Sequence, residues 1–149
     1  MLQLKALVID DSRVMRNMVM QNLNKAKLAE FEFVEAEDGA VGLTKFNPEE
    51  IDIVFVDWNM PNMTGIEFVR KVRALGGTEN IPIVMVTSEK SMGKIEEALD
   101  SAGANAYICK PFTPDDMTIK LKKLIDAIEA RLLKQQQPAS GGLLSKFFG

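Results

Sequence analysis

Four polar segments of this chain each follow a short apolar run, and together they carry reactive groups. The segments are Asp10-Asp11, Asp57, Thr87-Ser88 and Lys110-Pro111. The runs before them, residues 7–9, 53–56, 83–86 and 107–109, are typical of strands buried on both faces of a parallel sheet. Ligands bind beyond the carboxyl ends of such strands. We therefore expect one pocket that holds three carboxylates, a hydroxyl and an ammonium.

This set of groups suits a magnesium ion and a phosphoryl group. Crowded carboxylates repel one another, and Mg²⁺ takes oxygen ligands from carboxylates, water and phosphate. A lysine and a hydroxyl donate to phosphoryl oxygens, and a carboxylate can attack phosphorus to form an aspartyl phosphate. Asp57 is the predicted nucleophile because it stands alone after the most apolar run, whereas Asp10 and Asp11 form a pair suited to the ion.

The order of these motifs resembles the receiver domain of two-component response regulators, and within that family the single-domain chemotaxis regulators of the CheY type. The resemblance covers residues 5–131. It rests on four motifs taken jointly: Asp-Asp from Asp10, Asp-Trp-Asn-Met-Pro-Asn-Met from Asp57, Met-Val-Thr-Ser-Glu ending at Glu89, and Lys-Pro-Phe from Lys110. Each motif alone is weak, and their shared order makes the resemblance specific.

The resemblance implies a role for each acidic residue. Asp57 is implied to be the phosphoacceptor. Asp11, Asp57 and the main-chain carbonyl of Asn59 are implied to bind Mg²⁺, with Asp10 acting through bound water. The cofactor implied by the family is therefore Mg²⁺.

The resemblance also implies roles around the phosphoryl group. Thr87 is implied to bond one phosphoryl oxygen and Lys110 to pair with another. Tyr107 matches an aromatic position that turns inward when the threonine moves. Asn59 and Glu89 match positions that influence how readily water attacks the phosphoaspartate.

The function implied is phosphorylation-dependent signalling. The chain is expected to take phosphoryl from the phosphohistidine of a sensor histidine kinase and to switch a partner-binding surface, in chemotaxis and flagellar motor control. The expected partners are that kinase, an output protein such as a flagellar motor switch protein, and a phosphatase. The chain is not expected to be an enzyme, although it catalyses its own phosphorylation and dephosphorylation. A phosphorelay intermediate or a phosphate sink is the alternative within this reading.

Two other classes of protein fit the sequence less well than a receiver domain. Phosphatases of the haloacid dehalogenase type carry a second aspartate two residues after the nucleophile, but Ser12, Arg13 and Asn59 occupy those positions here. A phosphorylation-independent adaptor would normally have lost one of the five pocket residues, and none is lost.

Composition and sequence length exclude further classes of protein. A chain of 149 residues fits one domain, and its net charge of −3 with no basic stripe argues against nucleic-acid binding. The chain has no histidine, so a phosphohistidine must belong to a partner. One cysteine cannot form an intramolecular disulfide. No signal peptide or apolar run long enough to span a membrane is visible, so a cytoplasmic location is expected.

Apolar spacing predicts five helices, over about residues 12–27, 38–46, 64–75, 91–102 and 113–134, alternating with five strands. Val14, Met18 and Leu23 are examples of this spacing in the first helix, Met15 and Met18 are placed at core-like positions, and Thr113 is assigned to the N-cap of the last helix. The fold class is α/β, a doubly wound, flavodoxin-like parallel sheet. Its strand order, 2-1-3-4-5, comes from the known fold, for which the CheY regulator is itself a standard case.

The domain is expected over residues 1–134, followed by a tail over 135–149. Residues 135–142 have linker composition, whereas Leu143, Leu144, Phe147 and Phe148 form an apolar cluster. Two interpretations stay open: the tail is a docking peptide for a partner, or it is a loosely attached end that folds back on its own domain or has no role.

Overall fold

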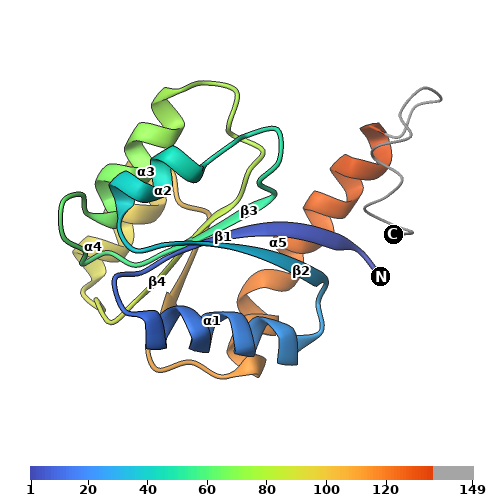
Figure 1. Cartoon of the computed structure of the whole chain (residues 1–149), viewed down its shortest axis with the longest axis horizontal. Coiled ribbons are helices and arrows are strands. Elements are labelled where there is room, and N and C mark those ends of the chain that lie inside the picture. The colour runs from blue at the N-terminus through green and yellow to red at the C-terminus, as the bar shows by residue number, and fades with distance from the viewer. Residues whose placement is uncertain (136–149) are drawn as a thin grey trace.

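The computed structural model describes residues 1–135, which form a parallel sheet with helices on both faces (Figure 1). The five strands lie in the order β2-β1-β3-β4-β5 and all neighbouring pairs are parallel. The strands are β1 (Gln3–Ile9), β2 (Glu30–Ala36), β3 (Ile53–Val56), β4 (Ile83–Thr87) and β5 (Ala106–Cys109). The predicted fold class and strand order are confirmed.

The helices are found where the sequence predicts them. They are α1 (Arg13–Ala26), α2 (Gly39–Lys45), α3 (Gly65–Ala74), α4 (Met92–Glu96), which continues as the π-helical segment η1 (Glu97–Ala102), and α5 (Pro114–Gln135). Most predicted boundaries differ by one residue, because the prediction included capping residues such as Ser12, Asp38 and Thr64. The π-helical turn was not predicted.

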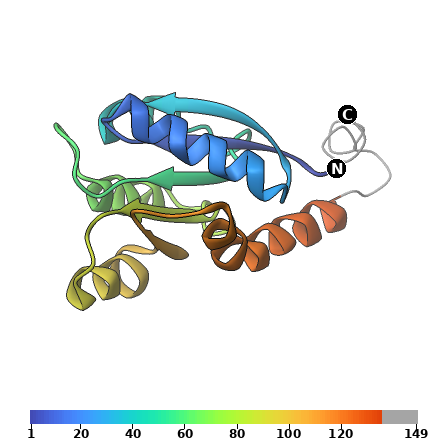
Figure 2. The ribbon, with the colours of Figure 1, turned by 90° about the horizontal axis from the view of Figure 1, so that it is seen from below.

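Two apolar layers hold the helices against the sheet. One layer joins α1 and α5 to the sheet, and the other joins α2, α3 and η1 to the opposite face, as Figures 1 and 2 show. All residues of β3 and β4 are buried, which explains why these strands have no polar alternation. Figure 2 shows the sheet from below, with α1 (blue) in front of it.

The predicted core-like position of Met18 in α1 is wrong. Val14 is 67% exposed and Met18 is also exposed, whereas Val19 and Leu23 are buried and Met15 is half-buried. Met15, Val19 and Leu23 are spaced by four residues and form one stripe toward the sheet, and Val14 and Met18 form a parallel stripe beside it. The sequence contains both stripes, and only packing against α5 and β1 selects the inner one.

The helix starts near the carboxyl ends of the strands are well capped. Thr64 and Glu67 form a reciprocal capping box at α3, so the Thr64 hydroxyl caps the helix. At α5, the amide of Asp116 donates to the Thr113 hydroxyl, and the Thr113 amide donates back to the Asp116 carboxylate. The predicted N-cap of α5 is confirmed.

The predicted tail lies almost wholly outside the described residues, which end at Gln135, the last residue of α5. Among residues 1–135, no helix is long and apolar enough to cross a membrane.

Candidate functional site

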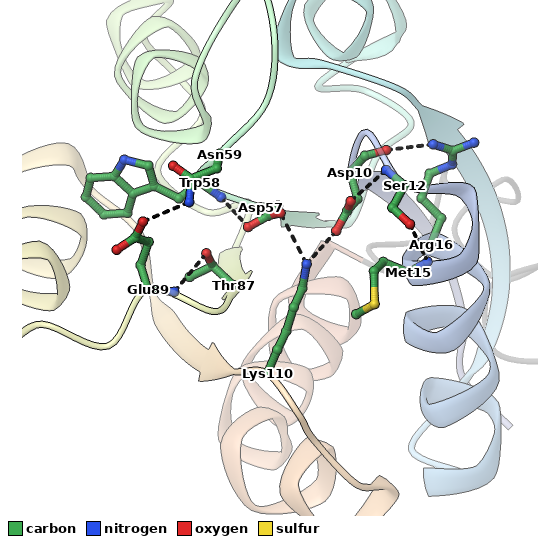
Figure 3. A network of polar contacts seen from close by, with 10 residues as sticks. All are labelled: Asp10, Ser12, Met15, Arg16, Asp57, Trp58, Asn59, Thr87, Glu89 and Lys110. Atoms are coloured by element: carbon green, nitrogen blue, oxygen red, sulfur yellow. Dashed lines mark hydrogen bonds and ion pairs between the residues drawn. The ribbon is translucent and has the colours of Figure 1, made fainter.

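The predicted site residues come together because Asp10, Asp57 and Lys110 each directly follow a strand end, and Thr87 is the last residue of β4. The Asp57 amide donates to the Ile9 carbonyl at 3.0 Å, and the Asp10 amide donates to the Ala36 carbonyl at 3.1 Å. On the other side, the Lys110 amide donates to the Thr87 carbonyl at 2.9 Å. β1, β3, β4 and β5 therefore deliver their following residues to one edge of the sheet (Figure 3).

The three predicted acidic residues form a cluster. One carboxylate oxygen from each of Asp10, Asp11 and Asp57 lies within 4.8 Å of the other two. Asp10 is 3% exposed and Asp57 is 8% exposed, whereas Asp11 is open to solvent. Closely spaced carboxylate oxygens are hard donors, and Mg²⁺ prefers such donors with room for water. The residues present therefore fit a magnesium ion.

Lys110 lies against two members of this cluster. Its Nζ is 2.9 Å from Asp10 Oδ2 and 3.1 Å from Asp57 Oδ2. Burial by itself lowers the pKa of Lys110, but the hydrogen bond to Asp10 and the negative charges of Asp57 and Asp10 together raise it above its ordinary value. The lysine is therefore protonated at neutral pH. One ammonium faces three carboxylates, so the cluster keeps a net negative charge that a cation can balance.

The other carboxylate oxygens of Asp10 and Asp57, the two buried aspartates, also accept hydrogen bonds. Asp57 Oδ1 accepts a hydrogen bond from the Trp58 amide at 2.7 Å, and Asp10 Oδ1 accepts one from the Ser12 amide at 2.9 Å. Ser12 in turn caps α1 by accepting from the Met15 amide. The start of α1 and the loop after β3 thus set the orientation of the two carboxylates (Figure 3).

Thr87, Tyr107 and Asn59 all connect to Glu89. Thr87 is buried and its hydroxyl accepts from the Glu89 amide at 3.3 Å. The Tyr107 hydroxyl donates to the Glu89 carbonyl at 2.7 Å, and the Asn59 side-chain amide donates to the Glu89 carboxylate at 2.8 Å. Three residues implied by the family resemblance are therefore each hydrogen-bonded to a fourth, Glu89.

The Tyr107 ring occupies an inward position, because the side chain is buried and its hydroxyl bonds the Glu89 carbonyl. Burial, with smaller contributions from Cys109, Glu89 and Asp57, raises the pKa of Tyr107 to about 12. The hydroxyl is therefore a hydrogen-bond donor throughout the neutral range.

Three residues that contribute to the site were not singled out from the sequence. Arg16 Nη1 donates to the Asp10 carbonyl at 2.6 Å, and Lys94 Nζ lies 4.8 Å from the centre of the Trp58 ring and 3.8 Å from Glu89 Oε1. Neither belongs to a local motif, so no sequence signal identified them.

Gly65 is the third, and its position before a helix after a polar loop was a usable signal. Its amide donates to the Trp58 carbonyl at 2.9 Å. A Cβ at this position would overlap the main-chain oxygen of Asp57. Only glycine therefore lets α3 begin against the loop that carries the phosphoacceptor candidate.

Comparison with known proteins agrees with this geometry. Residues 6–122 match the family model described as response regulator receiver domain. A chemotaxis protein CheY homolog of Campylobacter jejuni is 42% identical over 125 residues, which cover 82% of this chain and 92% of the relative. The chemotaxis protein CheY of Pseudomonas aeruginosa is 36% identical over 125 residues, covering 84% and 98% of the two chains.

Solved structures show the same fold. The chemotaxis protein CheY4 of Vibrio cholerae superposes with a TM-score of 0.71 at 36% identity, covering 82% of this chain and 98% of that one. A CheY-like receiver domain protein of Methanospirillum hungatei superposes with a TM-score of 0.73 at 29% identity, covering 87% and 98% of the two chains.

Proposed function

The chain belongs to the response regulator receiver family, with relatives of the chemotaxis CheY type, and we propose that it accepts a phosphoryl group on Asp57 from a phosphohistidine of a sensor histidine kinase. The observation that carries the proposal is the placement of Asp57. Its carboxylate lies at the carboxyl end of a central strand, held by the Trp58 amide and by Lys110, within a cluster of three carboxylates.

In the proposed transfer, a carboxylate oxygen of Asp57 attacks phosphorus. An O–P bond forms, the P–N bond of the phosphohistidine breaks, and the imidazole nitrogen keeps the bonding electrons. Lys110, which is protonated and already contacts Asp57, supplies a charge-assisted hydrogen bond to a phosphoryl oxygen. The buried Thr87 hydroxyl donates to another phosphoryl oxygen.

The acidic cluster is proposed to hold magnesium during this step. Asp10, Asp11, Asp57 and the main-chain carbonyl of Asn59 would hold the ion, with Asp10 acting through a bound water. When bound, Mg²⁺ supplies positive charge that offsets the negative charge of the carboxylates and of the phosphoryl oxygens.

The output step is proposed to pass through Glu89. The phosphoryl group carries about two negative charges and three acceptor oxygens, and because Asp57 gives up its own carboxylate charge when the O–P bond forms, the site gains about one negative charge. A Thr87 hydroxyl drawn to one of these oxygens changes its bond with the Glu89 amide, and the Glu89 carbonyl is the acceptor for Tyr107. Because the Tyr107 ring is already inward, the phosphoryl group is proposed to stabilise this position against others rather than to create it.

The proposed output is a protein contact in chemotaxis and flagellar motor control, because the similar proteins from Campylobacter jejuni and Pseudomonas aeruginosa are named as chemotaxis proteins. We do not propose an enzyme that turns over a separate substrate. A phosphorelay intermediate or phosphate sink would use the same chemistry at Asp57, and it would differ in binding no motor switch protein when phosphorylated.

The test is phosphorylation by a small-molecule phosphodonor, phosphoramidate, read by intact-protein mass. The wild-type chain is expected to gain the mass of one phosphoryl group with Mg²⁺ and to gain it far more slowly after chelation. Asp57→Asn is expected to gain none, whereas the matched control Asp126→Asn, an exposed position on α5, behaves as wild type. Stoichiometric modification of Asp57→Asn, or equal rates with and without Mg²⁺, contradicts the proposal.

A further inference from the structure

A groove lies at the opposite end of the molecule from Asp57. It has a volume of about 430 Å³ and runs between the C-terminal half of α5 and the loop before β4. Its lining includes Pro82, Leu124, Ile128 and Arg131. Figure 1 shows this half of α5 at the end of the molecule where β1 begins, whereas Asp57 follows the carboxyl end of β3. The groove is therefore separate from the phosphorylation site.

The loop wall of the groove is held in place by Arg73. This guanidinium donates to the Thr78 carbonyl at 2.6 Å, to the Gly103 carbonyl at 3.0 Å and to the Asn105 side chain at 2.8 Å. Asn105 Oδ1 also accepts from the Ile83 amide at the start of β4. Because the wall is fixed in advance, a segment entering the groove does not have to order it.

The groove has an apolar lining. Leu124 and Ile128 of α5 lie in it, together with Pro82 from the loop before β4. A segment with apolar side chains suits this lining, because docking removes apolar surface from water.

We propose that the occupant is the apolar segment of the chain's own tail, residues 143–148. This segment places Leu143, Leu144, Phe147 and Phe148 within six residues. Docking of this segment would cover Leu124 and Ile128.

The length of chain between helix and segment favours docking within one molecule. Seven residues, 136–142, separate Gln135 from Leu143. They span up to about 25 Å when extended, and the groove reaches back along α5 to Leu124, about 16 Å from Gln135 at 1.5 Å per residue. A connection of only seven residues also holds the segment at an effective concentration of about 1 mM, which a second copy reaches only in concentrated solution.

The first test places a nitroxide spin label on the tail of the full chain. Ser145→Cys is labelled in a Cys109→Ala background, and ¹⁵N-labelled amides are observed by NMR. Docking predicts broadening of the amide signals of Asn80, Ala127 and Arg131. Ala127→Glu, which puts a charge in the groove, is expected to abolish the broadening, whereas Ile119→Glu, the same charge at an exposed position of α5, leaves it.

Dilution with unlabelled, ¹⁴N protein separates the possible occupants. Unchanged broadening on dilution supports docking within one chain. Broadening that disappears on dilution comes from a label on a second molecule. It assigns the groove to the tail of a second copy and overturns the proposal. Absence of broadening at the groove also overturns it.

A second test avoids the cysteine substitutions and compares hydrogen exchange in the full chain with exchange in a chain truncated after Gln137. For an effective concentration of about 1 mM and a dissociation constant of about 0.1 mM, docking slows local opening about tenfold. Amides of residues 127–134 are expected to exchange about tenfold faster after truncation. Amides of Val19 and Leu23 in α1 serve as the internal control. Equal exchange of residues 127–134 in the two chains contradicts the proposal.

Discussion

Lys110→Met tests the electrostatics of the site through stability. The substitution keeps most of the side-chain length and removes the ammonium that lies 2.9 Å from Asp10 and 3.1 Å from Asp57. The lysine side chain is only 15% exposed and both carboxylates are buried, so water screens the loss poorly. The variant leaves two buried carboxylates facing each other without that charge.

The expected loss in the free energy of unfolding is about 2–4 kcal/mol. Removing one member of a buried ion pair typically costs about 3–5 kcal/mol. The loss here is placed lower because Asp57 and Asp10 each keep a main-chain amide donor, and because burying the lysine was itself unfavourable. With a urea m-value of about 2 kcal/mol/M, the midpoint should fall by about 1–2 M.

Urea unfolding followed by far-UV circular dichroism measures this loss. The matched control is Lys122→Met, which removes the same group from an exposed pair with Asp126 at 3.4 Å on α5. That control should change stability by less than about 0.5 kcal/mol. Two further results are expected: Asp10→Asn in the Lys110→Met background recovers part of the loss, and adding Mg²⁺ reduces it. A Lys110→Met variant as stable as Lys122→Met refutes the reasoning.

Three other predictions concern single positions. Asp11→Ala should weaken Mg²⁺ binding by at least about tenfold in calorimetric titration. The metal-free variant should be no less stable than the wild type, because the substitution removes an exposed carboxylate from a cluster of carboxylates that repel one another. Unchanged Mg²⁺ affinity would contradict this prediction. Gly65→Ala should lower thermal stability by several kcal/mol through overlap with the Asp57 main chain, whereas the control Gly93→Ala, which meets no atom within 4 Å, should not. Tyr107, the one tyrosine, should titrate near pH 12 when its ionisation is followed by ultraviolet absorbance. The free energy of unfolding should fall as the pH rises from about 10 to 12, because the folded state holds the proton that the unfolded state releases. Titration near pH 10 would contradict this prediction.

The candidate site was largely predictable from the sequence because it depends on strand ends. Asp10, Asp57, Thr87 and Lys110 each follow an apolar run, and parallel strands bring such positions together whatever the details of packing. The capping residues Thr64 and Thr113 could be predicted for a similar reason, since a cap involves only residues three positions apart.

The parts that could not be predicted depend on contacts between distant elements. Lys94 reaches Trp58 from α4, and neither residue shows a local pattern that pairs them. Met18 was wrongly placed in the core because Val14 and Met18 have the same helical spacing as Met15 and Val19, and spacing alone does not say which stripe meets α5.

The contacts of Lys94 suggest how a charge at Asp57 acts on α4. The ion pair with Glu89 is 3.8 Å long and both side chains are partly exposed, so it contributes little to stability. The position of Lys94 matters more than the strength of this ion pair. Lys94 stands over Trp58, whose amide bonds Asp57, and beside Glu89, whose amide bonds Thr87. The proposed phosphoryl group on Asp57 would therefore have two routes to the same lysine, one through each neighbour, and both end on the helix that follows β4.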